Sequence, residues 1–307
     1  MVGGRRLARD RRVDGDHRPE LSNHRAGISL TLLRAWPFRG IEVAPLRSRI
    51  VARLKALFAT WQCRDLHGER YAVLFLDGFH LKVRMARRVI AVPVLAALGV
   101  TDNGQKRLVA LHIAVTEATT SWSGLLTDFQ RRGLPSPLLV VTDGHAGLKN
   151  ALKAWPTARI QRCTTHKGRN LADACPVHAR AELKRDYHRI IHADDGLAAR
   201  AAYDTLVKKW TTLCPAVARS IEEAGLDLIT FFDFPKAMWK SLRTTNTLEN
   251  LNREFRRRTK TQASFSTEAA AVTLLYGLVA FGQIVLRRID GHERLAAFLA
   301  KEWSNAA

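Results

Sequence analysis

The sequence predicts an α/β fold whose central sheet contains both antiparallel and parallel strands, and three features support this prediction. Three apolar runs, which start at Tyr71, Val89 and Leu108, are separated by short connections typical of an antiparallel meander. A helical stretch then leads to a fourth apolar run, Leu138–Val141, which is bounded by turn formers like a strand buried on both faces. From about Lys167 onward the pattern becomes helical and basic.

The composition indicates a globular protein with a polyanionic partner. The chain has 307 residues, and 47% of them are hydrophobic, which is enough for a substantial core. Its 49 Lys and Arg exceed its 28 Asp and Glu by 21 charges, a surplus that favours nucleic acid as the partner. A generally basic protein without such a partner is the competing explanation. We expect no membrane association, because no basic amphipathic anchor stands out.

Cysteine usage and the apolar runs favour a cytoplasmic protein. Four scattered cysteines fit a reduced compartment, and the amino terminus lacks the apolar segment of a signal peptide. The longest apolar run, Ala269–Leu286, contains polar residues and glycines, so we interpret it as a buried helix and not as a membrane span.

The elements of the first half follow in order from periodicity. Met1–Pro45 is rich in Arg and Asp without a sustained period, so we expect it to be poorly ordered. Leu46–Trp61 has apolar residues at helical spacing. We predict that Tyr71–Leu76 is the first strand and Val89–Gly99 the second. We expect Lys82–Arg88 to be a basic connection between them.

The hairpin signal Asp102-Asn103-Gly104 leads to a third strand, Leu108–Val115. Ser121–Arg132 is predicted to be a helix ended by Gly133. The fourth strand runs to Asp143, and a helix around residues 147–154 precedes a short fifth strand, Arg159–Cys163.

The second half is mainly helical. Ala179–Ile191 and Gly196–Leu213 are the clearest helices, and Pro215 starts another because proline suits a first turn. A later helix carries Glu249, with Thr245 or Asn246 as its N-cap. We divide the chain into an amino-terminal segment, a first core part, a helical insertion and a carboxy-terminal core part: residues 1–45, 46–166, 167–240 and 241–307.

Three carboxylates are the candidate catalytic and metal-binding residues. Asp77 and Asp143 each follow an apolar run and precede a glycine, and α/β sheets place functional groups at the ends of such strands. The element order predicts a ribonuclease-H-like fold, in which the late helix brings Glu249 beside both. Three carboxylates can hold two Mg²⁺ ions for phosphodiester chemistry. The alternative is that the aspartates only form turns and that Glu249 complements a helix dipole, with Asp102 and Glu254 as weaker candidates.

Cationic residues near these carboxylates are candidates for DNA contact. The helix of Glu249 carries a run of cations, and further ones lie around the fifth strand; the candidates are Arg253, Arg256, Arg257, Lys260, Arg162 and Lys167. A solvated helix face is the alternative. Trp210 and Trp239 have surface suited to base stacking, although we favour the core for both.

The pairs Cys163/His166 and Cys175/His178 have equal spacing and raise the alternative of a zinc site. We favour His166 as a catalytic polar group near the scissile phosphate, with Cys163 packed beside it.

Four motifs together resemble the bacterial DDE transposases of the IS256 or Mutator-related family. They are residues 76–84 around Asp77, 141–149 around Asp143, 161–166 with Cys163 and His166, and 243–253 around Glu249. The resemblance covers about Leu46 to the carboxyl terminus. It implies an acidic triad of Asp77, Asp143 and Glu249, two Mg²⁺ ions (Mn²⁺ as a substitute), cleavage at element ends and transfer of the 3′ end to target DNA.

The resemblance further implies double-stranded DNA partners, namely terminal inverted repeats and target DNA, a homodimer, and a location at the bacterial nucleoid. Met1–Pro45 departs from the longer helical region of the family, so we expect a truncated or altered amino terminus. Two alternatives stay open: a basic DNA-binding relic without catalysis, and a nuclease of the same fold without strand transfer.

Overall fold

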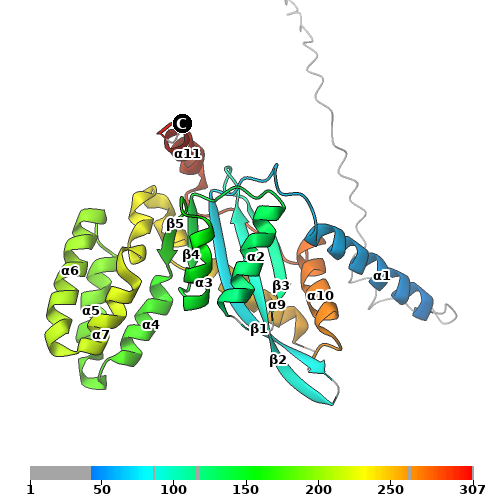
Figure 1. The fold of residues 1–307 in the computed structure, drawn as a ribbon, viewed down its shortest axis with the longest axis horizontal. Coiled ribbons are helices and arrows are strands. Elements are labelled where there is room, and N and C mark those ends of the chain that lie inside the picture. The colour runs from blue at the N-terminus through cyan, green and yellow to red at the C-terminus, as the bar shows by residue number, and fades with distance from the viewer. Residues whose placement is uncertain (1–42, 86, 115, 117, 261–263, 306–307) are drawn as a thin grey trace, which may run out of the picture. The chain divides into compact units, whose positions relative to one another are not determined.

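The computed structural model describes residues 43–85, 87–114, 116, 118–260 and 264–305. From Arg49 onward the chain forms one compact unit, which contains the sheet and the helices that cover it. The expectation of a poorly ordered segment lies mostly outside the described residues, since Val43 already belongs to the first helix, α1 (Val43–Gln62). The structure is an α/β fold with a five-stranded mixed sheet, as predicted, and it is compatible with a ribonuclease-H-like arrangement (Figure 1).

The sheet has the order β3-β2-β1-β4-β5. Its first three strands form the predicted antiparallel meander, and the last two run parallel to β1. The Asp102-Asn103-Gly104 turn joins β2 to β3, and Gly104 has the positive φ of 79° that this turn requires. The strands are β1 (Val73–Met85), β2 (Arg88–Val100), β3 (Lys106–Ile113), β4 (Leu139–Thr142) and β5 (Arg159–Arg162).

The first strand is longer than predicted. The segment Lys82–Arg88, expected to be a connection, continues β1 to Met85, where the chain turns back into β2 with Met85 opposite Arg88. The cause is a period of two, in which buried Phe79, Leu81 and Val83 alternate with the polar residues between them. The prediction that Asp77 ends a strand is therefore wrong, because Asp77 lies within β1.

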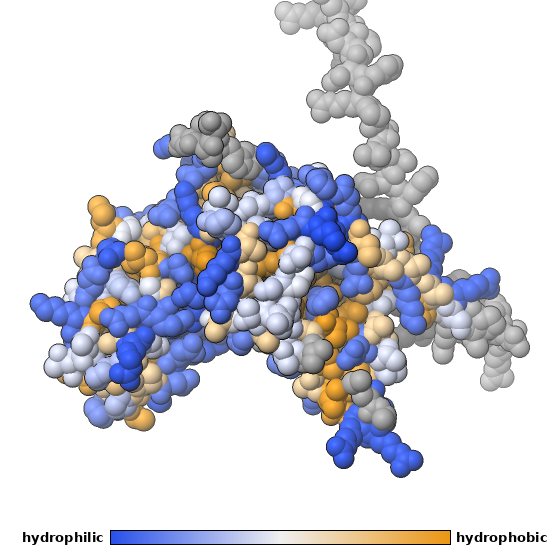
Figure 2. All heavy atoms as spheres, in the orientation of Figure 1, coloured by the Kyte–Doolittle hydropathy of each residue, from blue (hydrophilic) through white to orange (hydrophobic). Residues whose placement is uncertain are grey.

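The far end of this hairpin combines cationic and apolar exposed side chains. Arg84, Arg87 and Arg88 are exposed, as are Val89 and Ile90. Figure 2 shows an apolar surface along the hairpin that ends in a hydrophilic tip.

Each face of the sheet is covered by a different set of helices. Alternate residues of β1 separate into two hydrophobic clusters, because successive side chains of a strand point to opposite faces. Leu74 and Leu76 pack on the side of α2 (Thr119–Arg131) and α3 (Ala146–Ala151). The opposite face packs against α9 (Asn246–Thr259), which lies behind the sheet in Figure 1, and against α10 (Glu268–Ala280), which is drawn to the right of it next to α1.

Several helices match their predicted positions. The predicted face of α2 is buried through Trp122, Leu125, Leu126 and Phe129, and Gly133 follows with a φ of 82°. The apolar run from Ala269 is helical only to the end of α10 at Ala280. Among the described helices, none combines the length and the hydropathy needed to cross a bilayer.

The helical segment between β5 and α9 has its own hydrophobic cluster, which includes Leu171, Tyr187, Trp210 and Ile221. Trp210 is completely buried there. Trp239 is partly buried and packs against Phe231 and Phe232 at the edge of the core, so both tryptophans contact a hydrophobic cluster, as predicted. The segment contains α4 (Thr164–Ala174), α5 (Arg180–Ile191), α6 (Gly196–Leu213) and α7 (Pro215–Ala224).

Short elements complete the chain. Two further α-helices are α8 (Trp239–Leu242) and α11 (Leu295–Asn305). Single-turn 3₁₀ helices connect the longer elements: η2 (Leu152–Ala154), η3 (Val177–Ala179), η4 (Gly225–Leu228), η5 (Thr230–Asp233), η6 (Lys236–Met238) and η7 (His292–Arg294).

One buried carboxylate organises the helical segment. Asp186 accepts hydrogen bonds from the Trp210 indole at 3.0 Å, from Lys209 at 2.6 Å and from Arg189 at 3.1 Å. Burial raises the pKa of Asp186, but the hydrogen bonds from Lys209 and Trp210 outweigh burial and leave this pKa below its usual value. The folded state therefore favours the charged carboxylate.

We predict that Asp186→Ala lowers the free energy of unfolding by about 2–4 kcal/mol, because it leaves the buried Trp210 N–H without an acceptor. Urea unfolding above pH 6 measures the change. The contribution of Asp186 is present above the unfolded-state pKa and is lost as pH falls, so the two proteins should converge in acid. The matched control is Asp204→Ala, which removes an exposed pair with Arg200 and should cost less than about 1 kcal/mol; equal losses in both variants would refute the assignment.

Candidate catalytic site

Strand pairing places the two aspartates side by side. The parallel pairing of β1 with β4 ends at Leu76 opposite Thr142, and the next residue in each strand direction is Asp77 and Asp143. Asp77 continues within β1, whereas Asp143 begins the turn into α3, where its carboxylate accepts the backbone N–H of His145 at 2.9 Å. Two positions that are far apart in the sequence thus become neighbours because two strands share a register.

Glu249 reaches the same place from α9. The helix begins after Thr245, whose carbonyl accepts the N–H of Glu249 at 3.1 Å. The apolar stripe of Leu248, Leu251 and Phe255 is buried against the sheet, as the sequence predicted. The rings of Phe255 and Phe79 lie 6.2 Å apart. Since Phe79 and Asp77 point to the same face of β1, this packing brings the first turn of α9 to the carboxylate side.

Asp143 and Glu249 lie close enough to Asp77 to affect the pKa of its carboxyl group. Burial, followed by the negative charge of Asp143, raises the pKa of Asp77 to about 7, and Glu249 contributes in the same direction. His166 and the backbone N–H of Gly78 oppose this rise. Asp77 itself is only 7% exposed. The sequence prediction that these three side chains converge is therefore consistent with the geometry of the site.

The three carboxylates suit divalent cations because they are negatively charged and because one of their buried oxygens has no hydrogen bond. Carboxylate oxygens are the ligands that Mg²⁺ prefers. Glu249 Oε1 is buried without a hydrogen bond and lies 3.5 Å from His166 Nε2. Among the residues that the structure describes, no three His, Cys, Asp or Glu side chains are arranged as ligands of one ion. The fit to cations accordingly rests on the negative charge gathered around buried Asp77 and on the Glu249 oxygen that has no hydrogen bond.

His166 is held beside the carboxylates by Cys163 and Thr245. The Sγ atom of buried Cys163 accepts the backbone N–H and the hydroxyl of Thr245, each at 3.4 Å, and that hydroxyl lies 3.3 Å from His166 Nδ1. The hydrogen bond with Cys163 raises the pKa of His166 to about 8, burial opposes it, and the charges of Cys163, Asp77 and Glu249 reinforce it. Burial raises the pKa of Cys163, but hydrogen bonds with His166 and Thr245 lower this pKa by more.

Sequence reasoning found His166 and Cys163 but missed that Thr245 connects them. It considered Thr245 only as an N-cap, and its side chain makes no capping hydrogen bond. The link joins residues 82 positions apart and follows from the docking of α9 against α4. No local pattern in the sequence carries that information.

Arg162 and Lys167 lie where DNA phosphates cannot contact them directly. Both are buried, at 6% and 1% exposure, and both pair with Glu223 of α7, at 3.2 Å and 2.8 Å. Lys167 also donates to the carbonyl of Ser220 at 2.7 Å, and Arg162 donates to the carbonyl of Gly144. We therefore correct the DNA-binding assignment of these two residues to a structural one. The sequence could not reveal Glu223 as their partner, because the contact depends on how α7 packs against α4.

Arg162 also fixes the turn that holds Asp143. Gly144 has a φ of 79°, a conformation that residues with a Cβ atom rarely adopt. The guanidinium of Arg162 occupies the space beside it, since a Cβ atom at position 144 would lie 1.5 Å from Arg162 Nη1. The geometry of this turn thus requires a glycine for two independent reasons.

The cations predicted on α9 are exposed. Arg253, Arg256, Arg257 and Lys260 all lie on the solvent side of the helix. Arg253 donates to Asn250 at 2.7 Å and Arg257 to Glu254 at 3.1 Å. A hollow of about 400 Å³ next to the β1–β2 hairpin is lined by Lys82, Arg256 and Lys260 among others. These cations are accessible to a polyanion.

The weaker candidates lack support from the geometry. Asp102 lies in an exposed turn and accepts the N–H of Asn103 at 2.8 Å. Glu254 pairs with Arg257 and Arg258 on α9. His178 is exposed in η3, and no metal-ligand set that includes it or Cys175 exists among the described residues.

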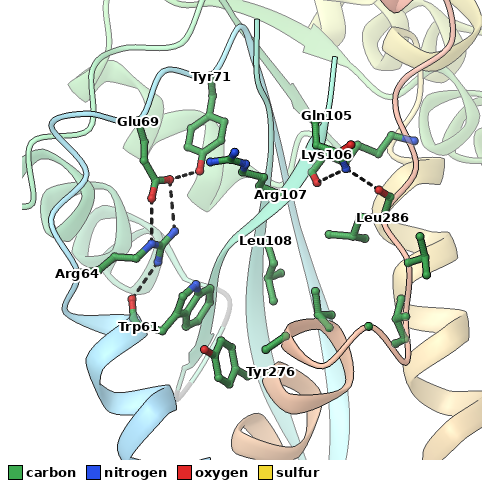
Figure 3. A pocket seen from close by; sticks show the side chains of 15 residues that line it. Trp61, Arg64, Glu69, Tyr71, Gln105, Lys106, Arg107, Leu108, Tyr276 and Leu286 are labelled. Atoms are coloured by element: carbon green, nitrogen blue, oxygen red, sulfur yellow. Dashed lines mark hydrogen bonds and ion pairs between the residues drawn. The ribbon is translucent and has the colours of Figure 1, made fainter. Parts of the chain in front are cut away.

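A separate hollow of about 520 Å³ lies between α1, β3 and α10, and none of the three carboxylates lines it (Figure 3). In it Arg64 pairs with Glu69 at 3.0 Å, and Glu69 accepts the hydroxyl of Tyr71. Trp61 and Tyr276 form one wall, with ring centroids 4.9 Å apart. Its one carboxylate, Glu69, is already paired with Arg64 and Tyr71, so we do not regard this hollow as the reaction centre.

Comparison with known proteins gives a consistent result. The family model described as "Transposase, Mutator family" matches residues 40–282. The chain is 37% identical over 213 residues to the transposase for insertion sequence element IS905 of Lactococcus lactis, which covers 69% of this chain and 54% of that protein. It is 35% identical over 221 residues to the transposase for IS1081 of Mycobacterium tuberculosis, with 72% and 53% covered.

A third relative is the transposase for IS406 of Burkholderia multivorans, 34% identical over 235 residues, with 76% of this chain and 60% of that protein covered. The chain thus spans a little over half of the length of these curated relatives.

We predict that Gly144→Ala lowers the melting temperature by about 4–8 °C, because the new methyl group must displace Arg162 and the φ of residue 144 becomes strained. Differential scanning calorimetry measures the shift. Gly68→Ala is the control, since an added Cβ at that exposed position meets no atom within 4 Å and the φ there is not positive. A Gly144→Ala protein as stable as the control would show that Arg162 does not fix this turn.

Proposed function

Because the chain belongs to the Mutator family of transposases, we propose that it cleaves DNA at the ends of an insertion sequence and transfers the freed 3′ ends to target DNA. The single observation that supports this chemistry is the convergence of Asp77, Asp143 and Glu249. Their elements follow the order that the ribonuclease-H-like fold uses: a meander, a parallel strand and a late helix. We therefore assign the core to that fold.

The three carboxylates would hold two Mg²⁺ ions, with Mn²⁺ as a substitute. When bound, such ions lower the pKa of the attacking water or 3′-hydroxyl and neutralise negative charge on the leaving oxygen. The chain itself contributes by holding the three carboxylates in position. Strand register fixes Asp77 next to Asp143, the Gly144 turn fixes the direction of Asp143, and the buried stripe of α9 fixes Glu249.

His166 contributes a proton at the edge of the site. With a pKa raised to about 8, its imidazole is mostly protonated at neutral pH and can donate to a phosphate oxygen. Cys163 and Thr245 hold the ring from behind, so its orientation is set before DNA binds. We assign His166 to orient the scissile phosphate and to offset its negative charge.

DNA lies along the exposed cations in this proposal. Arg253, Arg256, Arg257 and Lys260 follow one side of α9 away from Glu249, and Lys82 of β1 extends the same charged surface. Phosphates of double-stranded DNA contact such surfaces without regard to sequence. We propose terminal repeats and target DNA as the two substrates, and a homodimer that acts on both ends of an element.

We predict that Asp77→Asn, Asp143→Asn and Glu249→Gln each reduce divalent-dependent cleavage by about 100-fold or more, because each removes a charge that a cation requires. DNA affinity should stay close to that of the wild type. The assay follows nicking and strand transfer on labelled element-end DNA, with Asp102→Asn as the control, since that carboxylate lies in an exposed turn.

A second measurement on the same proteins does not depend on turnover. Added Mg²⁺ or Mn²⁺ should raise the melting temperature of the wild type and of Asp102→Asn by a few degrees, and raise that of the three site variants less. Wild-type cleavage at the same rate in any site variant would remove that residue from the triad. Nicking without strand transfer would indicate a nuclease, and DNA binding without cleavage would indicate a relic.

We predict that Arg253→Ala and Arg256→Ala weaken binding to all duplex sequences alike. Each variant should also reduce the slope of log K, the logarithm of the association constant, against log salt concentration by about 0.9 for each phosphate that it no longer binds. Fluorescence anisotropy across a salt series measures both quantities. Lys153→Ala is the control, because this exposed lysine lies in η2, on the other side of the sheet. An unchanged salt slope in both arginine variants would place the DNA elsewhere.

A further inference from the structure

A second cationic hollow adjoins the catalytic site on its other side. It has a volume of about 560 Å³ and lies between α4, α5 and the junction of α8 with α9. Neither the triad nor the candidate DNA-binding cations of α9 line it. It is therefore not explained by the proposed contacts with duplex DNA.

The lining of this hollow is positively charged and contains no carboxylate. Five cationic residues contribute to it: Arg169, Arg180, Lys184, Lys240 and Arg243. Within the described part of the chain, Arg169, Lys184 and Lys240 are exposed and have no ion pair. By contrast, Lys209 and Arg200 of the same helical segment each pair with acidic residues. Unpaired cations gathered around one hollow favour an anionic ligand.

The floor of the hollow is apolar. Leu171, Leu183 and Tyr187 line it and belong to the hydrophobic cluster of the helical segment. Gly168 forms part of the wall, and a Cβ atom at that position would lie 3.1 Å from the Tyr187 ring. A small residue at position 168 leaves room beside this ring. A cationic rim over an apolar and aromatic floor matches a ligand that has both phosphates and flat apolar groups.

The hollow and the catalytic site share their dividing wall. His166 on α4 faces Glu249, whereas its neighbours Thr164 and Thr165 line the hollow. On the other chain segment, Thr244 and Asn246 line the hollow while Thr245 contacts His166. The two segments are joined directly, since Thr164 donates both its N–H and its hydroxyl to the carbonyl of Arg243, at 2.9 Å and 3.0 Å. The hollow therefore lies directly beside the catalytic site, separated from it only by these two segments of the chain.

We propose that this hollow binds an unpaired stretch of the DNA strand adjacent to the reacting phosphodiester. Lys184, Lys240 and Arg169 contact its phosphates, and the apolar floor receives a base or sugar. A hollow of this size accepts a ligand of drug-like dimensions, which corresponds to about one or two nucleotides and excludes a duplex. The assignment of the ligand to DNA rests on the proposed transposase function.

The test compares two DNA probes that differ only in strandedness. One is a blunt duplex, and the other is the same duplex with a short single-stranded flank. The variant carries Lys184→Glu together with Lys240→Glu, both exposed helix positions. The control carries Lys153→Glu together with Lys208→Glu, which imposes the same change in net charge on exposed residues outside the hollow. Circular dichroism and melting temperature confirm that both proteins fold.

The wild type and the control should bind the flanked probe more tightly than the blunt probe. In the Lys184→Glu, Lys240→Glu protein this preference should disappear, and the salt dependence of log K for the flanked probe should fall by about 0.7 for each phosphate that the variant no longer binds. Binding to the blunt probe should match that of the control.

Three results would overturn the proposal: a wild type without preference for the flanked probe, a variant that retains this preference, or equal losses of affinity on both probes. These outcomes are independent of catalysis. If the wild type shows the preference, and the variant loses it, but no protein cleaves DNA, then the hollow is confirmed and the proposed function fails. If cleavage requires the triad but the preference is absent, the function stands without this site.

Discussion

The site depends on one unfavourable arrangement, in which the fold buries the carboxylate of Asp77 and places it beside the negative charge of Asp143. Asp77 is buried and faces the charge of Asp143, and its raised pKa of about 7 reflects that cost. The rest of the structure holds this arrangement in place. Strand pairing fixes the two aspartates, and the packing of α9 on the sheet adds Glu249. Stability given up at such a place is typical of a functional site, because a cation or a substrate can recover it.

Two groups of cationic side chains surround this acidic centre and serve different purposes. Arg162 and Lys167 are buried and paired with Glu223, so they organise the protein. Arg253 and Arg256 on α9 are exposed, so they face solvent and any polyanion there. A net charge of +21 does not distinguish the two roles. Burial and pairing do, because a buried paired cation is not free to bind a phosphate.

Most of the fold was predictable from periodicity, whereas the expectation that the three carboxylates lie close together came from the order of the elements. The face of α2 and the stripe of α9 follow from apolar spacing in which each buried residue keeps its helical position. The extension of β1 was missed because Asp77-Gly78 imitates a strand end, while the alternation that continues beyond it is weak by comparison. The partners of Arg162, Lys167 and His166 were not predictable. Each contact joins helices whose relative packing is a tertiary property that local sequence does not encode.

The shared carboxylate of Glu223 has a consequence for how this protein can be divided. It belongs to α7, yet both of its cations stand at the junction of the sheet with α4, and one of them touches the turn of Asp143. Removal of α7 would take the counter-charge away from Arg162 and Lys167 and would expose both cations beside the turn of Asp143. The turn of Asp143 is therefore tied, through Arg162, to a helix that lies much further along the chain, so we expect the helical segment and the sheet to fold as one unit.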